Sequence, residues 1–107
     1  MSHIYFLYFC GMINQRQKDT IIQHLLPIGP DKIGVFGSFA RSENETDSDL
    51  DILIYLDKNK KISLLKLIGL EQSLSDALGI KVDLITERSL HPMVRPYIEK
   101  DLKIIFE

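Results

Sequence analysis

The apolar run "DLDILIYL", residues 49–56, begins with two aspartates. Its alternation predicts a strand with one wholly apolar face. The opposite face carries Asp49 and Asp51, whose Cα atoms would lie about 7 Å apart. Two bare carboxylates at the start of a buried strand repel each other and are costly to desolvate. The run therefore predicts either a simple loop-to-strand junction or a site for a divalent cation.

A third carboxylate lies in a later apolar run, "IKVDLIT" at residues 80–86. In a strand, Asp83 would share its face with Lys81, and its two immediate neighbours are apolar. If this strand pairs with the first, Asp83 joins Asp49 and Asp51, and three carboxylates suit Mg²⁺ with substrate phosphates completing its shell. Two such ions, about 4 Å apart, would clamp the attacking and leaving oxygens of a nucleotidyl transfer. Taken alone, an aspartate such as Asp83 is more often an exposed strand residue on a small sheet.

A Gly-Ser pair follows the short strand predicted over residues 32–36. Gly37 would let the backbone approach a phosphate closely. A helix starting at Ser38 would add free N–H groups and a positive dipole end. Arg41 lies about one turn further on and would reach a phosphate or orient a carboxylate. Each signal is weak alone, but strand, Gly-Ser, Asp-x-Asp and a later mid-strand Asp together predict a nucleotide site.

The rest of the chain alternates helical and strand patterns. Helices are expected from Met12 to the breaker at Pro27, over residues 63–78 and over residues 89–100, and a short edge strand is expected over residues 102–106. This order predicts an α/β (α+β) fold class, a small mixed sheet with helices packed on one face.

Composition narrows the class of protein further. The 107 residues suit a single domain, and one cysteine, Cys10, excludes an internal disulfide. A net charge of −2 argues against broad binding to nucleic acid. Residues 1–11 fit the rest poorly and are expected to be an atypical leader before a domain spanning 12–107. No signal peptide or membrane span is expected, which favours a cytoplasmic protein without a membrane partner.

The acidic pattern resembles the nucleotidyltransferase superfamily with the polymerase-β-like fold. That pattern is Gly-Ser, ten residues, Asp-x-Asp and a later acidic residue, and here it falls on Gly37–Ser38, Asp49–Asp51 and Asp83. The longer string "GSFAR...SDLDILI" is similar to the minimal nucleotidyltransferase (MNT) subgroup. One departure is Ser42, where the subgroup usually has Gly.

The resemblance implies a polymerase-β-like nucleotidyltransferase fold, ATP as substrate, Mg²⁺ as cofactor and release of pyrophosphate. It implies that Asp49, Asp51 and Asp83 hold metal, with Asp83 the expected base for an acceptor hydroxyl. Minimal members are commonly antitoxins of HEPN-domain ribonuclease toxins, so the implied reaction is AMP transfer to a toxin tyrosine. Two alternatives remain, a binding module that neutralises the toxin by contact and a small-molecule nucleotidyltransferase working as an oligomer.

Overall fold

The computed structural model describes residues 13–40 and 49–107. The leader expected at residues 1–11 lies outside them. In chain order the elements are α2 (Gln15–Leu25), the 3₁₀ helix η1 (Leu26–Ile28), β1 (Lys32–Phe36), β2 (Leu50–Tyr55), α3 (Leu64–Leu78), β3 (Val82–Thr86), the 3₁₀ helix η2 (Glu87–Ser89), α4 (Arg95–Asp101) and β4 (Lys103–Phe106).

The four strands form one mixed sheet in the order β3-β2-β1-β4. Strand β1 is antiparallel to both β2 and β4, whereas β2 and β3 run parallel. A parallel pair needs a crossover, and α3 supplies it between β2 and β3. The predicted mixed sheet and the closing edge strand are confirmed.

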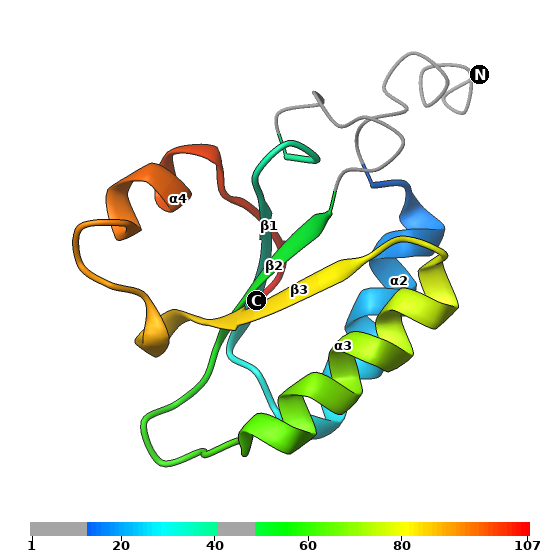
Figure 1. Cartoon of the computed structure of the whole chain (residues 1–107), viewed down its shortest axis with the longest axis horizontal. Helices are drawn as coiled ribbons and strands as arrows, with labels where there is room; N and C mark the ends of the chain where they lie inside the picture. The colour runs from blue at the N-terminus through cyan, green and yellow to red at the C-terminus, as the bar shows by residue number, and fades with distance from the viewer. Residues whose placement is uncertain (1–12, 41–48) are drawn as a thin grey trace.

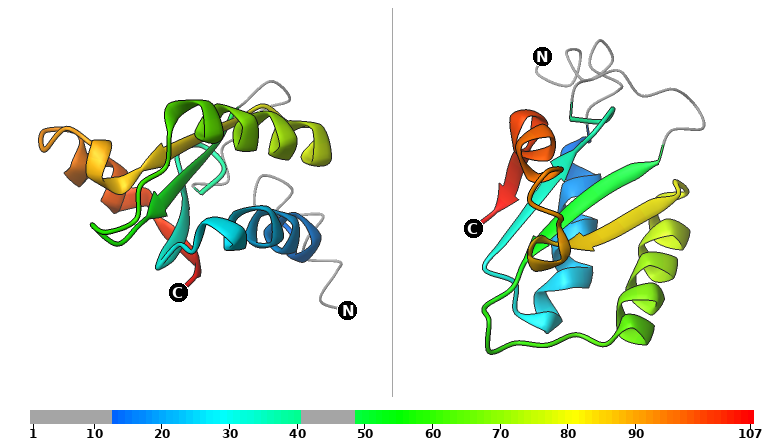
Figure 2. Two further views of the ribbon diagram at one scale, coloured as in Figure 1. Left: turned by 90° about the horizontal axis from the view of Figure 1, so that it is seen from below. Right: turned by 60° about the vertical axis from the view of Figure 1, so that its left-hand side comes forward.

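The two long helices, α2 and α3, cover one face of the sheet, as predicted from the sequence (Figure 1). The short helix α4 lies on the opposite side of the sheet (Figures 1 and 2). Just after α4, Leu102 packs over β1, where a Cβ on Gly34 would lie 2.5 Å from Leu102 Cδ1. The second face is therefore covered only in part.

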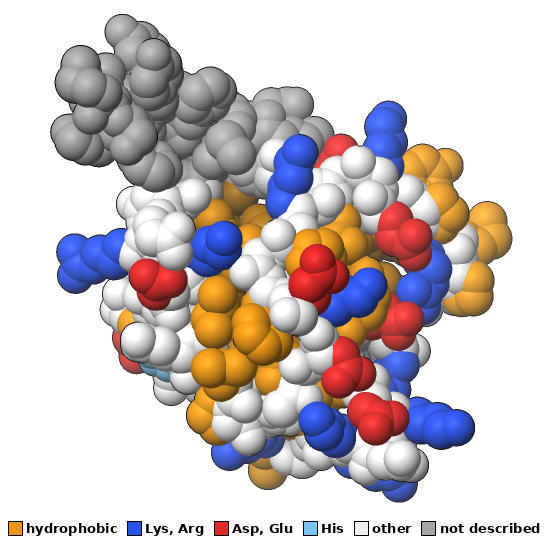
Figure 3. Space-filling view, turned by 180° about the vertical axis from the view of Figure 1, so that it is seen from behind, with side chains coloured by type: hydrophobic (Ala, Val, Ile, Leu, Met, Phe, Trp, Pro, Cys, Tyr) orange, Lys and Arg blue, Asp and Glu red, His pale blue; other side chains and the backbone are white. Residues whose placement is uncertain are grey.

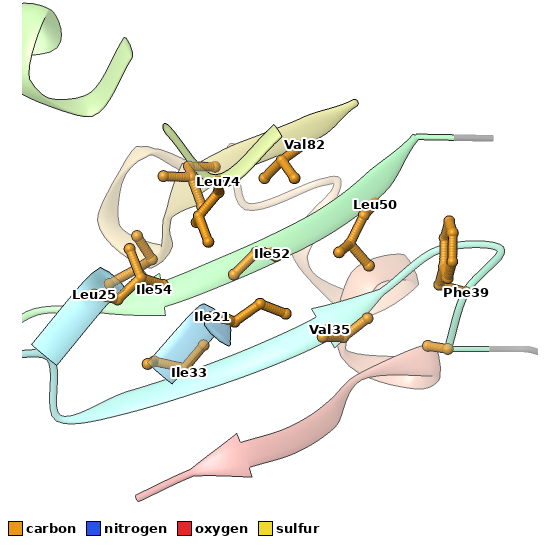
Figure 4. Packing of buried hydrophobic residues seen from close by; sticks show 12 residues of the cluster. Ile21, Leu25, Ile33, Val35, Phe39, Leu50, Ile52, Ile54, Leu74 and Val82 are labelled. Carbon is orange, nitrogen blue, oxygen red and sulfur yellow. The ribbon is translucent and has the colours of Figure 1, made fainter. Parts of the chain in front are cut away.

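The core lies between the sheet and the helices α2 and α3 (Figure 4). The alternate residues of β2 that the sequence placed on one face all belong to this core or pack against it. Its buried members are Ile21, Leu25, Ile33, Val35, Phe39, Ala40, Leu50, Ile52, Ile54, Leu74, Val82 and Leu84. This layer fixes which face of each strand points away from the helices, and that second face carries the acidic residues.

Local signals set the helix ends. Asn14 caps α2 in a reciprocal pair with Gln17, and Ser63 caps α3 by accepting from the N–H of Lys66. Gly79 ends α3 in the left-handed conformation, with φ of 69°.

The helix predicted over residues 89–100 begins only at Arg95. His91 precedes Pro92, and a residue before proline is disfavoured in the helical region. Residues 92–94 form a turn instead, and Pro96 is tolerated because it lies in the first turn of α4.

Candidate active site

The candidate site lies on the second face of the sheet, at the end where β1 finishes and β2 and β3 begin. Asp51 of β2 is paired with Asp83 of β3, and on its other side it is paired with Phe36 of β1. Directly paired residues point to the same face, with Cβ atoms about 5 Å apart. The predicted pairing of these two strands is confirmed, and it places two half-exposed carboxylates side by side.

The turn after β1 closes against this pair. Gly37 has a φ of 78°, in the left-handed region that favours glycine. A Cβ built on Gly37 would overlap Oδ2 of Asp51. Glycine is therefore required here twice, for the backbone conformation and for the close approach of the turn to the carboxylate.

The same turn packs into the hydrophobic core through two of its side chains. Phe39 and Ala40 are 6% and 8% exposed and belong to the core cluster. Residues 38–40 form a turn, so the helix expected to begin at Ser38 is not seen in the described part of this segment. Ser38 follows Gly37 directly in this turn, so its backbone lies beside the site. Arg41, the third expected nucleotide contact, lies outside the described residues.

Asp49 lies just before β2 and faces Lys81. Its Oδ2 lies 3.8 Å from Nζ of Lys81, with the two side chains 37% and 74% exposed. A pair so open to solvent contributes little to stability. Among the residues that the structure describes, no three His, Cys, Asp or Glu side chains gather closely enough to form a metal site.

The described coordinates therefore bring together Asp51, Asp83 and Gly37, but they do not bring Asp49 into a triad. Lys81 was not named as a site residue from the sequence. The available signal was the strand alternation, which places Lys81 on the same face as Asp83.

The far end of this face is closed by α4 and its surroundings. Leu53 is fully buried there, two residues along β2 from Asp51. Burial raises the pKa of Tyr55, the nearby carboxylates of Glu99 and Glu87 raise it further, and Arg95 opposes them. Arg95 is held by Glu87, with 3.0 Å between Nη1 and Oε1.

The face thus carries Tyr55 at the end near α4 and the two carboxylates of Asp51 and Asp83 at the other end. Seen from behind the molecule, positive and negative side chains are intermixed around exposed apolar groups (Figure 3). Among the described residues, no broad surface of one sign is visible from that side.

A small mixed sheet with two helices on one face, a glycine turn and paired aspartates on the other is the arrangement of a nucleotidyltransferase domain. The family described as "Nucleotidyltransferase domain" matches residues 16–105, and the chain belongs to it. The predicted family and fold are confirmed, and the chain is a nucleotidyltransferase.

One protein of similar sequence and one solved structure illustrate what the chain resembles. A Methanocaldococcus jannaschii protein named "Putative protein adenylyltransferase MJ1217" is 61% identical over 71 residues, which are 65% of this chain and 70% of that protein. A solved structure described as "Structure of putative minimal nucleotidyltransferase" superposes with a TM-score of 0.70 at 30% identity, covering 83% of this chain and 89% of that one.

A second solved structure shares the fold. It is described as a tri-AMPylated Shewanella oneidensis HEPN toxin in complex with MNT antitoxin, and it matches with a TM-score of 0.70 and 24% identity over 88% of this chain and 72% of that one.

None of the helices in the described ranges is both long and apolar enough to cross a membrane.

Proposed function

We propose that this protein is a Mg²⁺-dependent protein adenylyltransferase that transfers AMP from ATP to a tyrosine of a HEPN-domain toxin and so neutralises it. The observation that carries the proposal is the pairing of Asp51 with Asp83 beside the Gly37 turn. The relative that is 61% identical is named an adenylyltransferase, and a structure of the same fold contains an AMPylated toxin.

The donor set fits magnesium. Mg²⁺ prefers carboxylate oxygens and is commonly bound by one or two of them together with substrate phosphates. Asp51 and Asp83 supply two adjacent carboxylates, so a first Mg²⁺ ion needs no third protein ligand in order to bind. Asp49 is proposed as an additional ligand once its side chain leaves Lys81, a surface pair that costs little to break. When bound, the metal neutralises phosphate charge and lowers the pKa of an acceptor hydroxyl.

The chain's own groups have separate proposed roles. The Gly37–Ser38 turn approaches the triphosphate, because glycine leaves room for a phosphate oxygen. Arg41 is proposed as a further phosphate contact. Asp83 accepts the phenolic proton of the acceptor, the phenolate oxygen then bonds to the α-phosphorus, and the bond from that phosphorus to the bridging oxygen breaks to release pyrophosphate.

A tyrosine suits this site as the acceptor. Its hydroxyl reaches further from the backbone than that of serine, and its pKa of about 10 is easier to lower to the working range. The half-exposed carboxylates and the net charge of −2 disfavour a folded RNA as acceptor.

The test is mass spectrometry of a purified cognate HEPN toxin after incubation with this protein, ATP and Mg²⁺. A gain of one or more AMP units on a tyrosine, absent with Asp83→Asn, is expected. Asp76→Asn is the matched control, because it makes the same chemical change on the exposed side of α3. A toxin that is fully inhibited but unmodified would instead support a binding module that acts by contact.

A further inference from the structure

Two side chains of α3 accept hydrogen bonds from backbone N–H groups at the outer edge of β3, one on either side of Asp83. The N–H of Val82 donates to Oγ of Ser75 at 3.0 Å, and the N–H of Leu84 donates to Oε2 of Glu71 at 2.7 Å. Strand β3 is the last strand on its side of the sheet. Its outward N–H groups therefore have no neighbouring strand and are satisfied by the helix instead.

The backbone of Asp83 faces the other way. In a parallel pair, successive residues of a strand bond alternately to the two sides. The N–H of Leu50 donates to the carbonyl of Lys81 at 2.8 Å, so the odd-numbered residues of this strand bond toward β2. Asp83 is thus held to β2 on the inside, while its two neighbours are held to α3 on the outside.

The two outer bonds match in spacing because of the geometry of helix and strand. Four helical residues, from Glu71 to Ser75, advance about 6 Å. Two strand residues, from Val82 to Leu84, advance about 6.6 Å. The left-handed Gly79 reverses the chain at the end of α3, so the helix runs back along the strand and the two pairs of residues meet in order.

We propose that Glu71 and Ser75 are positioning residues for Asp83. They fix the register of β3 against β2, and this register places the carboxylate of Asp83 beside Asp51. This inference rests on the proposed function, since it assigns Asp83 to metal binding and to the acceptor proton. Glu71 lies on the helix-covered side of the sheet and acts through the backbone of Leu84. The competing explanation is that the two bonds only protect an open strand edge.

Three variants test the proposal. Glu71→Ala and Ser75→Ala each remove one acceptor, whereas Glu71→Gln keeps an oxygen that can accept the N–H of Leu84. The matched control is Asp76→Ala, which removes a carboxylate of the same helix whose bond is to the exposed Gln72. The readouts are kcat and the KM for ATP in toxin modification, the affinity for Mn²⁺ as the probe metal, and hydrogen exchange of the Leu84 amide.

For Glu71→Ala, kcat is expected to fall about 10-fold or more, as for other supporting groups around a metal site. Mn²⁺ affinity should fall in parallel and the KM for ATP should stay nearly constant, because the nucleotide also contacts the Gly37 turn. Glu71→Gln should recover most of both losses, and Asp76→Ala should match the wild type.

The proposal is overturned if Glu71→Ala is folded and exchanges its Leu84 amide rapidly, yet keeps the kcat and Mn²⁺ affinity of the control. The bonds would then serve only the strand edge. If Glu71→Ala does not fold, Ser75→Ala becomes the test variant, with the same expectations. If the wild type modifies no toxin, the proposed function fails, and the Mn²⁺ affinities still decide the positioning role separately.

Discussion

Replacing Gly37 by alanine should disable the site while the protein stays folded. The new Cβ would overlap Oδ2 of Asp51, which is the far end of a side chain and can rotate away. The free energy of unfolding should therefore fall mainly by the cost of an alanine in the left-handed conformation, about 1–2 kcal/mol. For a domain of this size that corresponds to a fall in melting temperature of about 5–15 °C. The carboxylate of Asp51, however, would be turned out of its place beside Asp83.

Gly79→Ala is the matched control for this change. Gly79 has a similar φ of 69°, but a Cβ there would meet nothing within 4 Å. Both variants therefore carry the same backbone strain, and only one of them disturbs Asp51. Their melting temperatures should fall by similar amounts, whereas AMP transfer should fall about 10–100-fold only in Gly37→Ala.

The assay pairs thermal unfolding, followed by circular dichroism, with the rate of toxin modification below the melting range of both variants. Mn²⁺ titration provides a measurement that does not depend on the acceptor. If Gly37→Ala transfers AMP and binds Mn²⁺ as well as Gly79→Ala does, the contact between the turn and Asp51 has no part in the site. The reasoning from Gly37 to the carboxylate pair would then be wrong.

Three further predictions concern the site and the fold. Asp83→Asn should abolish transfer yet raise stability by about 0.2–1 kcal/mol in urea unfolding without metal, because like charges of Asp51 and Asp83 oppose each other across the strands; a destabilised variant would contradict this. Leu74→Ala, at a fully buried position, should cost about 2–5 kcal/mol, whereas Leu65→Ala, at a position 82% exposed, should change the free energy of unfolding by less than about 0.5 kcal/mol. Since burial raises the pKa of Tyr55 above 10.0, its contribution is complete below that pH and is lost as the pH rises, so Tyr55→Phe should flatten the fall of stability between about pH 9 and 11; an unchanged slope would contradict this.

The sequence was sufficient for most of the strands. Strand β1 was predicted with its observed bounds, and β2 differed by one residue at each end, because regular alternation of large apolar residues leaves one choice of buried face. The same alternation placed Asp49 and Asp51 on one face of their strand, and it placed Asp83 beside them on the condition that the two strands pair.

Other features depended on contacts that no local pattern contains. The register of β3 against β2 is a contact between segments distant in sequence, so the direct pairing of Asp51 with Asp83 was not predictable. The proximity of Asp49 to Lys81 was not predictable either, because the two residues become neighbours only after the strands pair.

The helix expected at Ser38 stays a prediction, because residues 38–40 form a turn with Phe39 and Ala40 in the core, and the segment that would continue it lies outside the described residues. The metal-binding and nucleotide-binding roles themselves stay predictions.

The strand order has a consequence for how the chain folds. Strand β1 has one partner close by in sequence, β2, but its other partner, β4, lies near the end of the chain. Val35 therefore pairs with Lys103, a residue far away in sequence. Closing so long a loop is entropically slow, whereas the three strands that carry the acidic end are joined by shorter segments. The part of the sheet with Asp51 and Asp83 is therefore expected to assemble first during synthesis, with β4 docking last. Substitutions in β4 should slow completion of the fold and leave the edge of β1 open to other chains, without changing any group of the site.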